Sequence, residues 1–420
     1  MSVKAMALQE ADEDRDVARN AVRGILAAAT KLHAPATESL ADRAEKVAAV
    51  AADHAAAVDA GSRFPGEAIA AARAARLLGA AVPAELGGEG AKLSDIVDVC
   101  YRLGRSCAST AMIYAMHQTK VACVVRHGAT GAWHQRLMRR LSGEQLLLAS
   151  STTEGKAGGD VRNSAAPIER RGQRIALRRQ ATVISYGEAA DGIVTTARRA
   201  ADAASSDQVL VVFLKDDYRL TRLNGWDAFG MRGTCSDGFV LDASGSAEQI
   251  LPAGYDTIHT HTMLPVAHLC WSGAWAGITA SAVERARAFV RKAHGASGAM
   301  PPGAQHLTRA TATLRTLRNL INASLQRFEA ASSDPAALEA IDFQTAMAMH
   351  KVSASELAVA TVMSAMQACG IAGYRNDSEF SIGRQLRDIL SSPIMISNDR
   401  IMANVAAATL LGSVPASLRD

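Results

Sequence analysis

The hydrophobic period of this chain changes twice, and the two changes limit the folds that it can adopt. From Ser39 to about Arg140, alanine-rich segments carry charges every three or four positions, which is typical of helices. Short apolar or alternating runs punctuated by Gly, Asp and Asn then predict strands at 146–149, 175–177, 192–196 and 209–214. After Pro252 the helical period returns and continues to about Leu411.

This order predicts an α+β chain that is mostly α: helices, then an antiparallel β-domain, then a helix bundle. The expected parts are an N-terminal extension over 1–36, a helical domain over 37–144, a β-domain over 145–252 and a helical bundle over 253–420. We expect Ser94 to cap a helix, and we expect the glycine- and alanine-rich stretch 291–303 to form a loop.

The composition excludes several classes of protein. The 420 residues include 45 basic and 41 acidic side chains without a basic block, so we expect no nucleic-acid partner. The six cysteines lack C-x-x-C spacing, which argues against a metal site or a disulfide framework and predicts buried, reduced thiols. The sequence shows neither a signal peptide nor ~18 consecutive uncharged apolar residues, so we expect a cytoplasmic protein with no membrane partner.

The segment 226–236 (WDAFGMRGTCS) is too polar and too rich in glycine for a core element. It predicts a tight turn between strands that brings backbone donors, a guanidinium and a hydroxyl to one place. The competing interpretation is a hairpin turn that carries an unrelated arginine.

Four segments resemble motifs of the acyl-CoA dehydrogenase superfamily in their order and spacing. They are 78–88 (LGAAVPAELGG), 152–160 (TTEGKAGGD), 230–234 (GMRGT), and 367–374 (QACGIAGY) followed by 384–388 (RQLRD). The resemblance covers roughly 37–411 and extends to the flavin-dependent monooxygenase branch of that superfamily. It implies an N-terminal helical domain, a central antiparallel β-barrel-like domain and a C-terminal four-helix bundle.

The same resemblance implies bound FAD, whose charged groups need backbone N–H groups and hydroxyls held by glycine-rich turns. The positions that correspond to the family's flavin contacts within one subunit are Thr152, Thr153, Gly158, Gly159 and Ser185. Those that correspond to contacts with the FAD of a neighbouring subunit are Arg291, Gln367, Gly370 and Gly373. The cofactor site would then be shared between subunits, in a homodimer or homotetramer.

The chain departs from the family at the catalytic base. Acyl-CoA dehydrogenases remove an acidic α-proton with a glutamate, and that position is Ile396 here. The alternative position, at the start of the first C-terminal helix, is Ala267. Asp399 is the nearest carboxylate and is the candidate base; the competing interpretation is that Asp399 pairs with Arg400 or with a lysine at the surface.

We expect His117, His268, Trp271 and Met395 to line a substrate pocket. His268 and Trp271 are three residues apart on a predicted helix and share a face, and His268 stands where the family has an arginine. A histidine among apolar neighbours is also commonly a satisfied core residue. Val183 stands where the family usually places an aromatic side chain over the flavin.

The resemblance implies α,β-dehydrogenation of an acyl thioester, an oxidation of a CH–CH group with hydride transfer to flavin N5. The alternatives are a monooxygenase of the same fold that uses reduced flavin, and a flavin-binding protein without catalysis. The expected protein partner is an electron-acceptor flavoprotein in the first case and a flavin reductase in the second.

Overall fold

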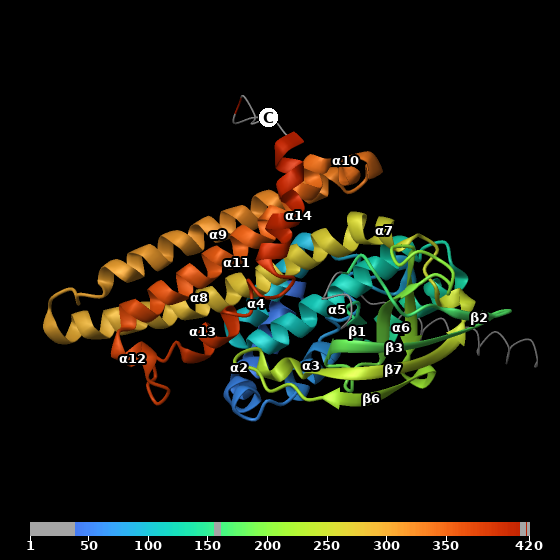
Figure 1. Ribbon diagram of the computed structural model, residues 1–420. Coiled ribbons are helices and arrows are strands. Elements are labelled where there is room, and N and C mark those ends of the chain that lie inside the picture. Colours follow the sequence, from blue (N-terminus) through green and yellow to red (C-terminus); the bar gives the residue numbers. More distant parts are fainter. Residues whose placement is uncertain (1–37, 155–160, 412–416, 418–420) are drawn as a thin grey trace, which may run out of the picture. The chain divides into compact units, whose positions relative to one another are not determined.

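The computed structural model describes residues 38–154, 161–411 and 417. The predicted extension over 1–36 and the predicted flavin contacts Gly158 and Gly159 lie outside these ranges. The described chain is mostly helical, with sheets in its middle third (Figure 1), which confirms the predicted fold class.

The N-terminal third is helical. Its elements are α2 (Leu40–Ala60), α3 (Gly66–Ala74), the short 3₁₀ turn η1 (Ala84–Leu86), α4 (Leu93–Ser106), α5 (Ala108–His127) and α6 (Ala132–Gly143). The prediction that Ser94 caps a helix is wrong. The cap residue is Lys92, two residues earlier, and the Asp95 carboxylate accepts the backbone N–H of Lys92 at 3.2 Å at the start of the helix.

Two sheets follow. One has the strand order β1-β4-β5 and contains β1 (Leu148–Ser151), β4 (Gly192–Arg198) and β5 (Gln208–Leu214). The other has the order β2-β3-β7-β6 and contains β2 (Glu169–Arg171), β3 (Arg174–Ser185), β6 (Tyr218–Asn224) and β7 (Ser236–Ser246). β4 and most of β5 are buried, whereas β3 alternates between buried and exposed side chains over most of its length.

Two details of the sheets differ from the sequence prediction. β1 pairs with β4 in parallel, because the intervening chain crosses to the other sheet to form β2 and β3; the remaining ladders are antiparallel. β2, β6 and β7 were not among the predicted strands. β6 is nearly all exposed and carries two arginines, so it lacks the apolar pattern that identifies a strand.

The C-terminal part is a bundle of helices, of which α8, α9 and α11 are the longest. Its elements are α7 (Tyr255–Ile258), the π-helical turn η6 (His259–Met263), α8 (Leu264–Ser297), α9 (Ala304–Ala331), α10 (Pro335–Glu339), α11 (Ile341–Cys369), α12 (Ile371–Tyr374), α13 (Gly383–Ile389) and α14 (Asn398–Leu411). α8, α9 and α11 pack on one another, and α14 packs on α11 (Figure 1). α11 is long and apolar enough to cross a membrane by length and composition, but 56% of its most apolar window is buried in this fold.

The predicted loop over 291–303 is wrong in its first half. α8 continues to Ser297 and ends at Gly298, which adopts the left-handed conformation (φ 68°) that favours glycine. The long helix is held at this end by Lys292, whose ammonium lies 2.6 Å from a carboxylate oxygen of Glu379.

α5 connects the helical and sheet parts of the molecule. It contacts β1 on one side and α8 on another, and Figure 1 shows it between the sheets and the C-terminal helices. Fifteen of its twenty residues are buried. Side chains on α5 can therefore reach a space enclosed by all three parts of the fold.

Candidate functional site

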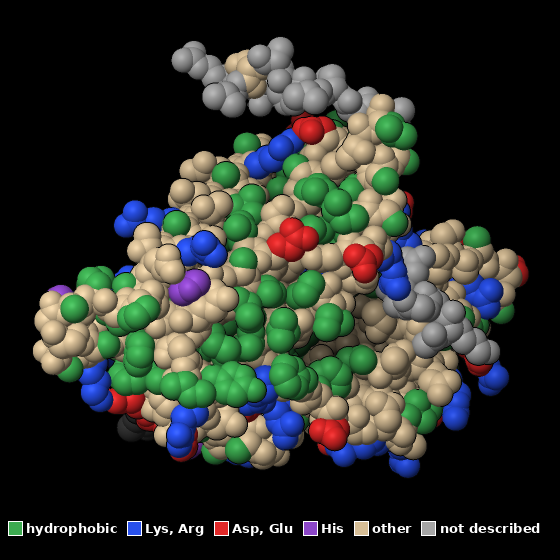
Figure 2. Space-filling view, turned by 60° about the vertical axis from the view of Figure 1, so that its left-hand side comes forward, with side chains coloured by type: hydrophobic (Ala, Val, Ile, Leu, Met, Phe, Trp, Pro, Cys, Tyr) green, Lys and Arg blue, Asp and Glu red, His purple; other side chains and the backbone are tan. Residues whose placement is uncertain are grey.

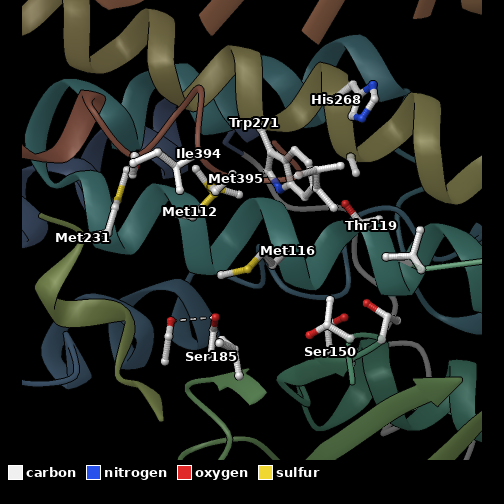
Figure 3. A pocket seen from close by; sticks show the side chains of 18 of the residues that line it. Met112, Met116, Thr119, Ser150, Ser185, Met231, His268, Trp271, Ile394 and Met395 are labelled. Carbon is white, nitrogen blue, oxygen red and sulfur yellow. Dashed lines mark hydrogen bonds between the residues drawn. The ribbon is translucent and has the colours of Figure 1, made fainter. Parts of the chain in front are cut away.

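A cavity of about 580 Å³ lies where α5, the sheets and the C-terminal helices meet. It has two walls of different character (Figure 3). The sheet wall presents hydroxyls and consists of Ser150, Thr152, Thr153, Val183, Ser185, Thr234 and Ser236. The helical wall is mostly apolar and consists of Met112, Met116, Thr119, Lys120, Met263, His268 and Trp271. Its volume lies in the range that ligand pockets occupy.

Three hydroxyls of the sheet wall form a chain of hydrogen bonds. Ser185 and Ser236 are paired across β3 and β7, and their Oγ atoms lie 2.8 Å apart. The Oγ of Ser236 lies 2.8 Å from the Thr234 Oγ1, which donates to the Met231 carbonyl at 2.8 Å. A register shift in β3 between Ala181 and Ile184 precedes this chain and orients Ser185.

The glycine-rich turn 230–234 follows β6 and precedes β7, as predicted, and it rests on the C-terminal segment. A Cβ at Gly230 would clash with the Arg387 carbonyl, so only glycine fits there. The Asp388 carboxylate accepts the Met231 N–H at 2.7 Å. Burial raises the pKa of Asp388 to about 6. Two motifs that are 157 residues apart thus meet at one edge of the cavity.

The guanidinium of this turn serves the fold. Arg232 donates to the Asp59 carbonyl at 2.8 Å and to the Ala228 carbonyl at 3.2 Å, and it is not among the described residues that line the cavity. Its neighbour Gly233 donates its N–H to the Ser109 Oγ at 3.1 Å. The turn is therefore tied to α2 and α5, while Met231 and Thr234 face the cavity.

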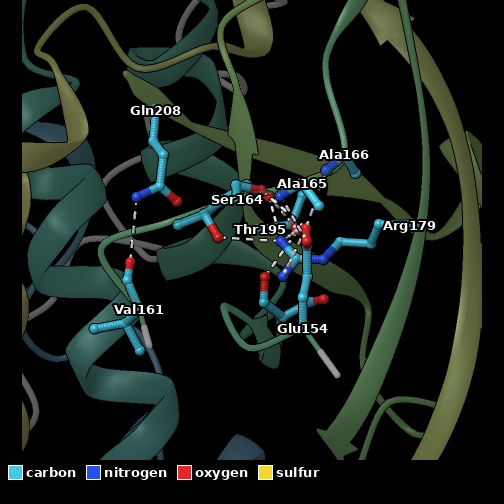
Figure 4. Close-up of polar contacts among 10 residues, drawn as sticks. Glu154, Val161, Ser164, Ala165, Ala166, Arg179, Thr195 and Gln208 are labelled. Atoms are coloured by element: carbon cyan, nitrogen blue, oxygen red, sulfur yellow. Dashed lines mark hydrogen bonds and ion pairs between the residues drawn. The ribbon is translucent and has the colours of Figure 1, made fainter. Parts of the chain in front are cut away.

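A buried ion pair lies where the chain leaves the sheet wall (Figure 4). The Glu154 carboxylate lies 3.4 Å from the Arg179 guanidinium and accepts the Ser164 hydroxyl at 2.8 Å and the Ala165 N–H at 2.7 Å. Arg179 also donates to the Thr195 hydroxyl at 3.1 Å. The pair fixes the chain directly after Thr152 and Thr153, both of which line the cavity.

Both positions that correspond to the family's catalytic glutamate line the cavity. Ile396 and Ala267 face it, beside Met395, so an apolar side chain occupies each place. Asp399 is exposed and is not among the described lining residues, which include Arg400 instead. Among the described lining residues none is Asp or Glu.

His268 and Trp271 share one face of α8, as predicted, with their ring centroids 5.8 Å apart, and both line the cavity. His268 donates Nδ1–H to the Met347 carbonyl at 2.9 Å, which leaves Nε2 as an acceptor. Burial lowers the pKa of His268 to about 3, so its ring is neutral. The indole Nε1 of Trp271 is buried without a hydrogen-bond partner among the described residues.

The structure places His117 in the core. Its Nε2 lies 2.9 Å from the Leu78 carbonyl and its Nδ1 accepts the Leu148 N–H at 3.0 Å. These two contacts join α5, the 78–88 segment and β1. Burial lowers the pKa of this histidine to about 4, and His117 is not among the described residues that line the cavity.

Lys120 lines the cavity and was not predicted from the sequence. Its side chain is 4% exposed, and its Nζ donates to the Met263 Sδ at 3.4 Å. Burial lowers the pKa of Lys120 to about 8. The available signal was a lysine directly before the apolar run 121–125 of α5, since a lysine is almost never fully buried unless its charge has a partner.

Arg291, Gln367, Gly370 and Gly373 lie away from this cavity, and none of them lines it. Arg291 is exposed near the end of α8, and Gln367 and Gly370 are exposed at the end of α11, while Gly373 is buried. These ends are neighbours, because Gly303 at the start of α9 packs directly on the backbone of Ala368. The four residues thus form a second group, at the end of the bundle that carries α12 (Figure 1).

Comparison with known proteins gives matches across both helical parts. The acyl-CoA dehydrogenase N-terminal domain matches residues 35–144, and the acyl-CoA dehydrogenase C-terminal domain matches residues 258–411. The chain belongs to the acyl-CoA dehydrogenase family. The chain is therefore a flavoenzyme of this family.

Its curated relatives carry different activities. Cyclohex-1-ene-1-carbonyl-CoA dehydrogenase of Geobacter metallireducens is 27% identical over 340 residues, which cover 80% of this chain and 87% of that protein. L-evernosamine nitrososynthase of a Micromonospora species is also 27% identical, over 363 residues and 83% of each protein.

Solved structures show the same fold. FMN-bound TdsC from Paenibacillus sp. A11-2 superposes with a TM-score of 0.78 at 16% identity, covering 90% of this chain and 98% of that one. The nitrososynthase of Micromonospora carbonacea superposes with a TM-score of 0.77 at 24% identity and the same coverage.

The cavity fits the flavin that the family uses. Its sheet wall offers the hydroxyls of Thr152, Thr153 and Ser185, and a flavin ring needs such donors along its polar edge. Trp226 and Phe229 also line the cavity and supply aromatic surface that Val183 does not. Trp226 is fixed by a hydrogen bond from its Nε1 to the Met231 carbonyl at 3.0 Å.

Proposed function

We propose that this flavoenzyme is a monooxygenase that uses reduced flavin and acts on an apolar small molecule. The observation that carries the proposal is the chemistry of the two glutamate positions. Ile396 and Ala267 both line the cavity, so the places from which a carboxylate would remove an α-proton hold aliphatic side chains. The polar groups of the described lining side chains are instead hydroxyls, imidazoles, indole N–H groups, an amide and cationic groups.

A bound flavin accepts a hydride from carbon or, once reduced, activates dioxygen. The residues of this chain would divide the remaining work. Thr152, Thr153 and Ser185 hold and orient the ring from the sheet wall. The Ser185–Ser236–Thr234 chain can hold a proton at the wall or pass it along its hydroxyls. The neutral His268 accepts a hydrogen bond at Nε2, and the methionines of the helical wall exclude water.

FAD held between subunits is the cofactor arrangement that we propose. Arg291, Gln367 and Gly370 are exposed at the far end of the bundle, where they can approach only a cofactor carried by another copy of the chain. Exposed apolar side chains in the described residues include Ile371 and Tyr374 beside them, which are 73% and 72% exposed. Figure 2 shows that hydrophobic side chains gather on one face of the molecule, next to a hollow. Burial of such surface would drive association into a homodimer or homotetramer.

Dehydrogenation of an acyl thioester is the second candidate. The 27% identity to a cyclohex-1-ene-1-carbonyl-CoA dehydrogenase over 87% of that protein supports it. Asp399 would have to supply the base in this case. Because Asp399 is exposed and is not among the described lining residues, its backbone segment would have to shift for its carboxylate to reach the cavity.

One pair of measurements on the flavin-loaded protein separates these candidates. The first is anaerobic bleaching of the oxidised flavin by butyryl-CoA, octanoyl-CoA and cyclohex-1-ene-1-carbonyl-CoA. The second is the reoxidation of the photoreduced protein after rapid mixing with dioxygen. A monooxygenase is not bleached by the thioesters, and its oxidised-flavin absorbance returns only after a lag. Bleaching by any of the thioesters, together with its loss in Asp399→Asn, would instead establish dehydrogenation with Asp399 as the base.

A further inference from the structure

Lys120 places a buried ammonium group in the helical wall of the cavity. An ammonium carries three N–H donors, and among the described residues this one donates to the Met263 Sδ, a weak acceptor, at 3.4 Å. No carboxylate of the described chain lies within ion-pair distance of it. The residue is 4% exposed, so its ammonium group is largely removed from bulk water.

The surroundings of Lys120 oppose its charge. Cys123, on the same helix, is the titratable group that acts on the charge of Lys120, and Tyr255 and His259 of the α7–η6 segment line the same cavity. Burial raises the pKa of Cys123 to about 12, so its thiol is neutral. An isolated buried cation is costly and is normally retained when a partner arrives to neutralise it.

A second donor on the same wall has no partner. The Trp271 Nε1 is buried and makes no hydrogen bond with the described residues, and Trp271 lines the cavity from α8. Figure 3 shows Trp271 above the cavity, facing Met116, on the opposite side from Ser150 and Ser185. The helical wall therefore contains an ammonium group and an indole N–H that can donate hydrogen bonds to a ligand. The hydroxyls of the sheet wall lie on the opposite side of the cavity and do not accept these hydrogen bonds.

The rest of the helical wall is apolar and adaptable. Met112, Met116 and Met263 line it, and Met231 and Met395 extend the same surface. Methionine side chains are flexible and polarisable, so they accept apolar ligands of different shapes. A ligand that satisfies this wall has an apolar body and an anionic end.

We propose that Lys120 binds an anionic oxygen group of the substrate, and that the substrate is an apolar molecule that carries a carboxylate or a similar anion. This inference rests on the proposed function in one respect, since it assigns the flavin to the sheet wall and the substrate to the helical wall. Trp271 Nε1 is the second donor available to the same molecule. The lysine is a substrate-binding residue that fixes which end of the substrate points away from the flavin.

The test compares three probes of equal chain length: octanoate, 1-octanol and octylamine. Their binding to the full-length protein is measured by isothermal titration calorimetry, with and without FAD, in the wild type, in Lys120→Met and in Lys92→Met. Lys92 is an exposed lysine and serves as the control. A charge-assisted hydrogen bond in a buried site is worth about a factor of ten or more in affinity.

We expect the wild type to bind octanoate at least about tenfold more tightly than octanol, and octylamine most weakly. Lys120→Met should remove the preference for octanoate and leave octanol binding unchanged, while Lys92→Met behaves as the wild type. In the wild type the preference should also fade as the pH rises above about 8, the value to which burial lowers the pKa of Lys120. This pH series needs no variant, so it decides the matter even if Lys120→Met folds poorly.

Equal binding of octanoate and octanol by the wild type would overturn the inference. Loss of FAD from Lys120→Met with unchanged octanoate binding would also overturn it, because the lysine would then serve the cofactor. Failure of the proposed monooxygenase function would be recognised separately, because the thioesters would then bleach the flavin regardless of how octanoate, 1-octanol and octylamine bind. Binding of octanoate to the FAD-free protein keeps the lysine measurement independent of that outcome.

Discussion

Ile396 has a left-handed backbone conformation (φ 47°), which is unfavourable for a β-branched residue. It lines the cavity at a position where the family has a glutamate. Backbone strain of this kind costs on the order of 1–3 kcal/mol and persists where the surrounding structure enforces it. The surrounding segment is held by Ser392, which is buried, and by Asn398, which receives the Lys351 ammonium at 2.7 Å. At the scale of the residue, an aliphatic side chain and a left-handed backbone conformation coincide at the predicted position of the base.

Burial of Asp388 disfavours the charged form of its carboxyl group. Its pKa is raised from 3.8 to about 6, chiefly by burial, so the folded state binds a proton that the unfolded state has lost. The stability of the wild type relative to Asp388→Asn is therefore fully present below about pH 4 and is lost as the pH rises through 6. We expect the difference to change by about 3 kcal/mol at most over this window.

The measurement is urea unfolding of the wild type and of Asp388→Asn at intervals from about pH 4 to about pH 7. Asparagine keeps the acceptor for the Met231 N–H, so the contact with the turn is retained in the variant. A difference in unfolding free energy that does not depend on pH would contradict the assigned pKa.

At the scale of elements, the ion pair between Glu154 and Arg179 connects the end of the sheet wall to β3. The side chains of Glu154 and Arg179 are 6% and 1% exposed, and Arg179 also binds the Thr196 carbonyl of β4. Burial lowers the pKa of Arg179 to about 10. It stays charged near neutral pH and needs the carboxylate.

We expect Glu154→Gln to destabilise the protein by about 3–5 kcal/mol, because removal of one partner leaves the other charge buried and uncompensated. The double variant Glu154→Gln, Arg179→Met should recover much of that loss. Asp207→Asn is the matched control: it breaks an exposed pair with Arg199, whose side chains are 44% and 51% exposed, and should cost less than about 1 kcal/mol. Denaturant unfolding of the four proteins measures this. Equal effects of Glu154→Gln and Asp207→Asn would mean that the buried pair does not stabilise the connection between the end of the sheet wall and β3.

At the scale of the whole molecule, the chain presents two groups of family residues that do not meet. One lines the cavity, and the other, with Arg291 and Gln367, lies exposed at the far end of the bundle. Both groups can take part in one cofactor site per subunit if the exposed group contacts the cofactor that is bound in the cavity of a neighbouring copy. This arrangement makes oligomerisation a condition for tight cofactor binding.

Arg291→Ala should weaken FAD binding about tenfold or more, because a charge-assisted contact with phosphate is lost. Fluorescence titration of the flavin-free protein with FAD gives the dissociation constant, and sedimentation gives the oligomeric state, which should not change. Arg170→Ala removes another exposed arginine, on β2, and should leave FAD binding as in the wild type. FAD binding by Arg291→Ala as tight as by the wild type would place the second group outside the cofactor site.

The sequence by itself determined the class of fold and the order of its parts. Period 3.6 and period 2 are local properties, so the helices on either side of Gln145 and Pro252 and the strands β1, β3, β4 and β5 could be predicted from neighbouring residues alone. The turn at 230–234 was predictable for the same reason, because its glycines and polar side chains act within a few residues. The sequence also predicted that Ile396 and Ala267 stand at the glutamate positions of the family, since that inference depends only on the spacing of the motifs.

Only the tertiary structure determined which residues that are distant in the sequence contact one another. The parallel pairing of β1 with β4, the contact of Asp388 with Met231 and the placement of His117 in the core depend on residues that are distant in sequence. The same is true of Lys120: whether a lysine on an apolar helix faces solvent, a carboxylate or a cavity is set by the elements packed around it, here α8, η6 and the sheet wall. Its cost in free energy comes from burial, and burial is a property of the folded molecule.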